Sequence, residues 1–116
     1  MPQEPQFPQG QGLDMGEKGK EEALFQELFN EAQEAISRVY LPGTMAHIRE
    51  HQGELFNFIL LTERKLNELW LAMREGEPTL GQFKGTLRLW QDYHLKAIEL
   101  YRKQREQKEA GQGNLF

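Results

Sequence analysis

The sequence lacks cysteine altogether and contains a single serine, Ser37. The absence of cysteine excludes disulfides, thiolate catalysis and zinc sites built on cysteine. One serine, with no histidine and acid arranged around it, offers no machinery for nucleophilic catalysis. A glycine-rich phosphate loop after a strand is missing as well. We therefore expect a protein that is not an enzyme and that needs no cofactor.

Long apolar runs and an excess of basic residues are also missing. The longest uncharged apolar run, residues 55–62, is far shorter than the roughly 20 residues that a membrane-crossing helix needs. The first ten residues have no basic start and no apolar run, so we expect no signal peptide and a cytoplasmic protein. The net charge of −4 disfavours a protein whose whole surface coats nucleic acid.

What the chain does contain is typical of one small helical domain. It has 116 residues, of which 38% are hydrophobic and 28% are charged. Residues 1–19 are rich in proline, glutamine and glycine, and such a segment buries too little apolar surface to offset the entropy of ordering it. We expect a disordered arm over 1–19, a helical body over 20–110, and a flexible tail over 111–116.

Three stretches of the body have the apolar periodicity of helices. Apolar side chains recur at steps of three and four residues over 20–41, over 44–75 and from 80 towards 110. A Pro-Gly pair ends the first helix, and Gly76 ends the second, which we expect to be continuous and roughly 45 Å long. Short connections make neighbouring helices antiparallel. The predicted fold is all-α, an antiparallel three-helix bundle with long second and third helices.

The second and third helices carry more apolar side chains than one seam uses. The additional residues are Phe56, Leu60 and Trp70 on the second helix, and Leu89, Tyr93 and Leu100 on the third. A helix that is apolar over a wide arc is buried on more than one side. We expect this second stripe to face another copy of the chain in a homodimer. The alternative is a wide core seam that the first helix covers.

The histidines give only a weak indication of a metal site. His47 and His51, with Glu50 beside them, match the H-x-x-E-H spacing of the inverzincin zinc proteases over five residues. That motif also needs a third ligand and a cleft, so we expect solvated surface histidines, with zinc binding as the weaker alternative. The chain has no Glu-x-x-His pair of the kind that di-iron bundles use. His94 lies on the third seam, where we expect a hydrogen-bonded core residue.

Cations gather late in the third helix, at Arg102, Lys103, Arg105 and Lys108. They form a candidate contact for nucleic-acid phosphates, secondary to any other function. Acidic residues lie four positions away, as Glu99 does from Lys103, and such pairs stabilise an exposed helix without any ligand. We expect the structural role to dominate.

The last five residues resemble a known peptide. Gln112, Gly113, Asn114, Leu115 and Phe116 are similar to the peptide that binds the bacterial sliding clamp, whose usual form is Gln, two variable residues, Leu, Phe. Replication and repair proteins often carry that peptide at a C-terminus. The resemblance implies that the Gln hydrogen-bonds the rim of a pocket and that the Leu-Phe pair fills an apolar cleft. Asn is acceptable at the third position, whereas Gly departs from the favoured Leu at the second and implies weaker binding.

The same pattern occurs a second time, at residues 52–56, Gln-Gly-Glu-Leu-Phe. Leu55 lies on the seam of the second helix, so we expect this copy to belong to the core. The copy at 112–116 is flanked by glycine and is expected to be free. The leading hypothesis is a dimeric, non-enzymatic helical protein that docks on the sliding clamp in DNA replication or repair. The alternative is a helical adaptor or assembly subunit, with or without a contact to nucleic acid, whose tail folds back or has no role.

Overall fold

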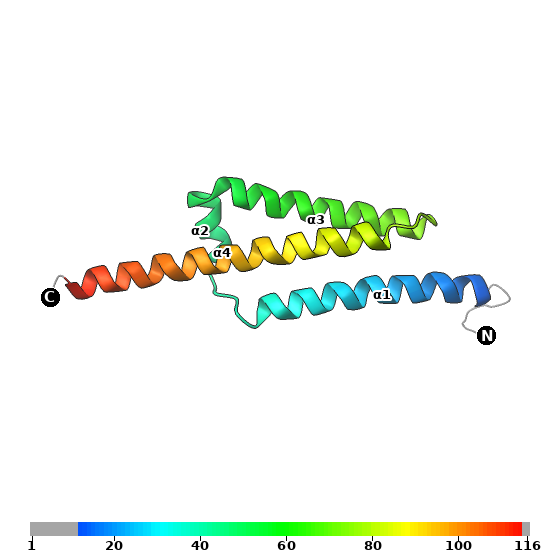
Figure 1. Ribbon diagram of the computed structural model, residues 1–116, viewed down its shortest axis with the longest axis horizontal. Helices are drawn as coiled ribbons and strands as arrows, with labels where there is room; N and C mark the ends of the chain where they lie inside the picture. The colour runs from blue at the N-terminus through cyan, green and yellow to red at the C-terminus, as the bar shows by residue number, and fades with distance from the viewer. Residues whose placement is uncertain (1–11, 115–116) are drawn as a thin grey trace.

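The structure, a computed structural model, describes the backbone of residues 12–114 and the side chains of residues 19–108. Every regular element in this range is a helix, which confirms the all-α prediction for the described part of the chain. Figure 1 shows the helices, and their bounds are α1 (Gly12–Ser37), α2 (Thr44–His51), α3 (Gly53–Arg74) and α4 (Leu80–Asn114).

The three long helices lie lengthwise beside one another, and α4 contacts each of the other helices (Figure 1). α3 runs antiparallel to α4, and α1 runs in the same direction as α4. This order follows from the short connections, since a chain that turns back after each long helix alternates its direction. The short α2 crosses the others at one end of the bundle, beyond which α4 continues.

The predicted second helix is not continuous. It breaks at Gln52, whose backbone angles are φ −136° and ψ 59°, outside the helical region. Gly53 follows, and glycine is about 1 kcal/mol less favourable than alanine inside a helix. The break turns α2 away from the line of α3 and lets it pack against α4 with Thr44 and Ile48 buried. The described chain therefore has four helices rather than three.

The helix ends also differ from the prediction. α1 begins at Gly12, so residues 12–19 are helical and do not belong to a disordered arm, whereas residues 1–11 lie outside the described residues. α4 continues through residues 111–114, so the flexible tail expected from Gly111 is helical as far as Asn114. Glycine raises the free energy of a helix without breaking it as proline does, which is why the glycines misled the prediction.

The two turns at which the chain reverses rest on glycines with left-handed backbones. Gly43 and Gly76 both have φ +97°. At the end of α3, the Gly76 N–H bonds the Met73 carbonyl and the Glu77 N–H bonds the Ala72 carbonyl, which together form a Schellman motif. The buried Thr79 hydroxyl then donates to the Leu69 carbonyl at 2.9 Å. This bond ties the start of α4 to the preceding helix.

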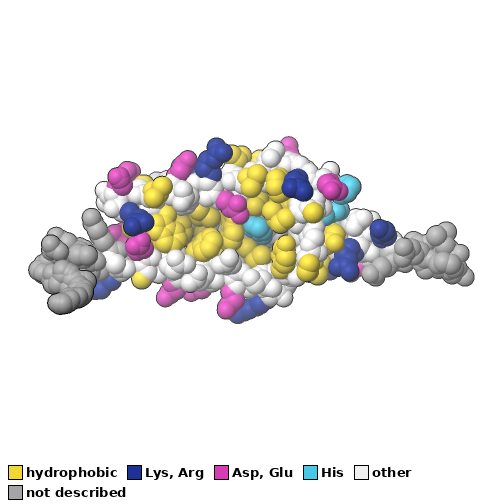
Figure 2. Space-filling model, turned by 180° about the vertical axis from the view of Figure 1, so that it is seen from behind, with side chains coloured by type: hydrophobic (Ala, Val, Ile, Leu, Met, Phe, Trp, Pro, Cys, Tyr) yellow, Lys and Arg dark blue, Asp and Glu magenta, His cyan; other side chains and the backbone are white. Residues whose placement is uncertain are grey.

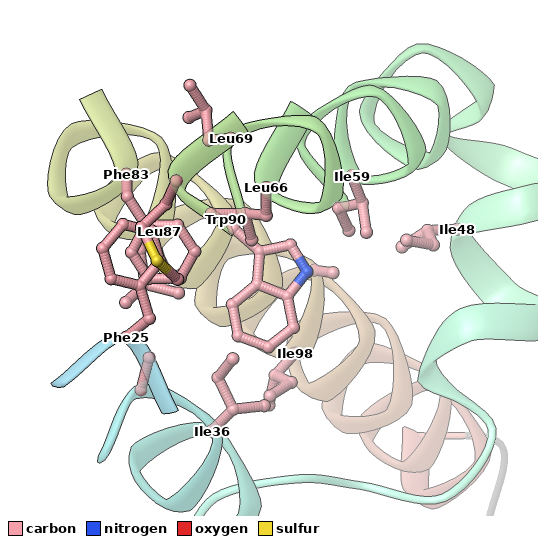
Figure 3. Close-up of a cluster of buried hydrophobic side chains, with 13 residues drawn as sticks. Phe25, Ile36, Ile48, Ile59, Leu66, Leu69, Phe83, Leu87, Trp90 and Ile98 are labelled. Carbon is pink, nitrogen blue, oxygen red and sulfur yellow. The ribbon is translucent and has the colours of Figure 1, made fainter. Parts of the chain in front are cut away.

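The core runs along the contact of α4 with the other helices (Figure 3). Its most tightly packed part is aromatic, because Phe83 of α4 stacks on Phe25 of α1 at 4.2 Å between ring centroids. Trp70 of α3 meets both rings edge-on at 5.8 Å. The buried hydrophobic residues are Phe25, Ala32, Ile36, Ile48, Ile59, Leu66, Leu69, Met73, Phe83, Leu87, Trp90, Ala97 and Ile98. All but one of them, Ile98, lie on the three predicted seams.

Candidate functional site

The end of α4 extends past the other helices (Figure 1). Residues 102–114 account for about 20 Å of this helix. Each side chain described in this stretch, over residues 102–108, is exposed. The predicted clamp-binding peptide follows directly: the backbone of Gln112 and Asn114 forms the last turn, while Leu115 and Phe116 lie outside the described residues. The side chain of Gln112 is likewise beyond the described side chains.

The internal copy of the pattern belongs to the folded body. It lies at the junction of α2 and α3, and its Leu55 and Phe56 side chains are half-buried and pack against the core. The apolar pair of this copy therefore serves the packing of α3, as expected, whereas its first three residues are exposed. Only the copy at 112–116 adjoins a part of the molecule that stands away from the bundle.

The four candidate cations, Arg102, Lys103, Arg105 and Lys108, are exposed on this projecting part of α4. Two of them have partners within the helix. The Lys103 ammonium lies 3.9 Å from a Glu99 carboxylate oxygen, as predicted. The Arg105 guanidinium lies over the Tyr101 ring at 5.7 Å from its centroid. Such exposed pairs support a helix weakly and leave the cations accessible.

His47 and His51 lie on one face of α2, with ring centroids 4.9 Å apart. The His47 ring also contacts Tyr101 of α4 at 5.1 Å, so His47 is half-buried and only His51 is a solvated surface residue as expected. Glu50 lies 3.8 Å from His51. Among the described residues, no group of three or more metal-binding side chains forms a site.

Tyr101 of α4 packs against the turn that precedes α2. The hydroxyl of Tyr101 approaches Gly43 so closely that a Cβ at that position would lie 2.8 Å from it. Glycine is needed there for a second reason as well, because its backbone is left-handed. Because His47 packs against the same Tyr101 ring, the H-x-x-E-H segment contributes to this contact between α2 and α4.

Sequence reasoning missed an open groove between α1 and α3, with α4 as its floor. This aromatic groove has a volume of about 360 Å³ and is lined by Gln26, Phe29, Glu63, Leu66, Asn67, Trp70, Phe83 and Trp90. Figure 2 shows hydrophobic side chains gathered along the middle of one face of the molecule. Phe29 stacks on Trp90 at 5.2 Å, so the two rings form a continuous wall. Four of its lining residues, Phe29, Leu66, Phe83 and Trp90, lie on the predicted seams, but a seam does not reveal where two helices diverge.

Polar groups at one edge of the aromatic groove centre on Glu63. The Trp90 indole N–H donates to a Glu63 carboxylate oxygen at 3.2 Å. His94 Nε2 lies 3.9 Å from the same oxygen, too far for a hydrogen bond, and this buried nitrogen has no partner among the described residues. The expectation of a hydrogen-bonded core histidine is therefore wrong. Burial lowers the pKa of His94, and the nearby Glu63 carboxylate only partly opposes that shift.

Only part of the predicted second stripe lies under α1. Trp70 contacts Phe25 of α1, so α1 does cover part of it. Leu89 of α4 is 49% exposed, and on α3 Phe58 and Leu61 are 40% and 55% exposed. Phe58 stacks on the half-buried Tyr93 at 5.5 Å, which joins these residues across α3 and α4. We call Phe58, Leu61, Leu89 and Tyr93 the α3–α4 apolar patch.

No helix in the described part of the chain has both the length and the apolar character that crossing a bilayer requires. Comparison of the sequence with protein-family models and with curated proteins, and of the structure with solved structures, finds no significant match. The geometry and the residues themselves are thus the basis for a functional proposal.

Proposed function

We propose that this chain is a non-enzymatic helical interaction protein that docks on the bacterial sliding clamp through residues 112–116, in DNA replication or repair. The observation that carries the proposal is the Gln-x-x-Leu-Phe pattern at the end of a helix that projects from the bundle. Adjacent aliphatic and aromatic anchors suit a preformed apolar pocket, where a few such side chains supply most of the binding energy.

Docking in an extended form requires the last turn of α4 to unwind. Gly111 and Gly113 lie in that turn, and each is about 1 kcal/mol less favourable in a helix than alanine. The turn therefore opens at little cost. Gln112 then reaches the pocket rim while Leu115 and Phe116 fill the cleft, and the absence of a side chain at Gly113 limits the affinity.

The test is capture on immobilised bacterial clamp of the full chain and of a variant that lacks residues 112–116. The deletion is expected to abolish capture and to leave helicity and melting temperature unchanged. Capture that survives the deletion, or that never occurs with the intact chain, contradicts the proposal. A melting temperature that falls on deletion would support the alternative, in which the tail folds back on the bundle.

We extend the proposal to a homodimer through the α3–α4 apolar patch. Three large apolar side chains, those of Phe58, Leu61 and Leu89, are at least 40% exposed on this surface, and a second copy would remove them from water. A dimer presents two tails to a clamp ring that offers more than one pocket, so avidity compensates for a weak motif.

Sedimentation equilibrium tests the dimer, with the Leu61→Asp/Leu89→Asp variant as the disrupted form. The intact chain should show twice the monomer mass, and the variant the monomer mass with the same helicity. Leu71→Asp is the matched control, because Leu71 is 52% exposed and lies outside the patch. A monomeric intact chain at high concentration would reject the dimer.

The second candidate function is a contact with nucleic acid by the projecting cations. It is favoured by the exposure of all four on a helix free of neighbours along residues 102–108. Such binding weakens steeply as salt rises, since it depends on the release of counterions. Fluorescence anisotropy with labelled DNA should show binding at low salt that Arg102→Ala/Lys108→Ala weakens. The absence of binding at low salt rules this candidate out.

A further inference from the structure

The aromatic groove is large enough to hold a ligand or a peptide segment. Its volume of about 360 Å³ lies within the range of roughly 300–1,000 Å³ that is common for ligand-binding pockets. Its walls are mostly aromatic and aliphatic, with two amides, Gln26 and Asn67, and one carboxylate, Glu63, as polar groups. On α4 the lining runs from Phe83 to Trp90, a length of about 10 Å along the helix axis.

A segment of this chain outside the described residues has the matching shape. In residues 1–11, proline recurs at every third position, at Pro2, Pro5 and Pro8, with Gln-Glu between the first two and Gln-Phe between the last two. The polyproline II helix has three residues per turn and rises about 3.1 Å per residue, so prolines at this spacing fall on one edge, about 9 Å apart. Aromatic-lined grooves recognise P-x-x-P segments in this conformation. One such pair matches the length of the aromatic groove.

The connection to α1 is long enough for this pairing. Gln26 and Phe29, the groove residues on α1, lie 14 and 17 residues from Gly12, about 21 and 25 Å along the helix. An extended chain spans at most about 3.3–3.6 Å per residue. Pro5 therefore reaches about 25 Å from Gly12 and Pro2 about 35 Å, whereas Pro8 reaches only about 14 Å. The pair that fits is Pro2 and Pro5, and Pro8 stays outside the groove.

We propose that the segment around Pro2 and Pro5 docks in the aromatic groove of its own chain as a polyproline II helix. The prolines pack against the half-buried Phe29 and Trp70 rings, and Gln3, which lies between the two prolines, faces the amides of Gln26 and Asn67. The proposal is independent of clamp binding, because the groove and the end of α4 share no residue. It also gives the N-terminal segment a fixed place, in contrast to the disordered arm that its composition predicts.

Tryptophan fluorescence of the full chain tests this directly, because the chain has two tryptophans and both line the groove. The Pro2→Asp/Pro5→Asp variant places carboxylates on the docking edge, near Glu63. We expect its tryptophan emission to shift to longer wavelength and to be quenched more strongly by acrylamide. Pro8→Asp is the matched control, with the same change of residue outside the reach of the groove, and it should leave both signals unchanged.

A peptide of residues 1–11 adds a second readout. Added to the Pro2→Asp/Pro5→Asp variant, it should restore the protected emission, and the same peptide with both aspartates should not. Equal quenching of the intact chain and the double variant, without any effect of the peptide, would overturn the proposal. So would protection in the intact chain that disappears on dilution, since docking within one chain does not depend on concentration.

Discussion

The two parts of α4 differ in their surroundings although they form one helix. Residues 80–101 contact the other three helices and contribute Phe83, Leu87, Trp90, Ala97 and Ile98 to the core. Residues 102–108 bury no side chain, and the helix continues to Asn114. The change falls at Tyr101, whose ring rests on Gly43 and His47 at the end of the bundle. Packing along α4 therefore stops where its neighbouring helices end, although α4 itself continues.

This difference separates a scaffold from a segment that a partner can remodel. Pairs such as Glu99–Lys103 contribute about 0.2–0.5 kcal/mol each to an exposed helix. A helix of about 12 residues without tertiary contacts is only marginally stable in water. A partner can therefore unwind the end of α4 at low cost, whereas unwinding the first part would expose the aromatic core.

The largest expected effect lies in the packed part. Phe83→Ala removes a ring that is fully buried and stacked against Phe25, and we expect a loss of about 3–5 kcal/mol of unfolding free energy, measured by urea denaturation. Arg88→Ala is the control on the same helix, because Arg88 is exposed and lies outside the α3–α4 apolar patch, so its loss should be small. Similar losses for both variants would mean that the packed part is not organised as described.

A smaller loss of stability is expected at the contact between Tyr101 and Gly43. Gly43→Ala meets both a left-handed backbone and a contact of 2.8 Å with the Tyr101 hydroxyl, whereas Gly76→Ala meets the same backbone angle with no atom within 4 Å. The backbone term is about 1–2 kcal/mol in each variant. We expect Gly43→Ala to lose roughly 1 kcal/mol more than Gly76→Ala, from overpacking. Adding Tyr101→Phe to both alanine variants should reduce the difference between their losses of unfolding free energy, because it removes the hydroxyl that crowds position 43. Equal losses in the two alanine variants would contradict the close contact.

A pH effect should come from His94. Burial lowers its pKa below the ordinary value of 6.5, so between these two values the unfolded chain binds more protons than the folded one. Unfolding free energy should therefore fall as the pH drops below about 6.5. Thermal melts over this range should show the decline in the intact chain and a weaker one in His94→Gln. A His94→Gln variant with an unchanged pH profile would show that another group is responsible.

The smallest effect on stability is expected at the projecting end. Ending the chain after Lys103 removes only side chains that are exposed or lie outside the described set, so the melting temperature should change little. Hydrogen exchange of the intact chain should likewise be fast for the amides of residues 102–108 and slow for those of 83–98. Slow exchange in both ranges would show that the end of α4 is held by contacts beyond the bundle.

Some elements of the fold could be predicted from the sequence and others could not. Apolar periodicity located the long helices and nearly all of the core, because each seam residue lies on a face that a neighbour covers. The break at Gln52 was missed, although a glutamine followed by glycine inside the predicted second helix was a visible signal. The ends of α1 and α4 were missed because composition argued for flexibility where nothing forces a helix to stop.

The sites were predictable to a lesser degree. The exposure of the projecting cations could be predicted from the sequence, because they follow the point at which the apolar periodicity of the third helix ends. The aromatic groove could not be predicted, because it lies where α1 and α3 diverge over α4. The angle between two helices cannot be deduced from the apolar periodicity of either one. His94 was misjudged for a related reason, since its 3.9 Å separation from Glu63 depends on the relative rotation of α3 and α4.

The most direct test of the division between the packed scaffold and the proposed binding end is the affinity for the bacterial sliding clamp, measured by surface plasmon resonance on one set of variants. Leu115→Ala/Phe116→Ala should abolish binding without a change in melting temperature. Gln52→Ala, in the internal copy of the pattern, should bind as the intact chain does. Gly113→Leu should bind more tightly, because it restores the favoured second residue. Unchanged binding by Leu115→Ala/Phe116→Ala, or loss of binding by Gln52→Ala alone, would contradict the account.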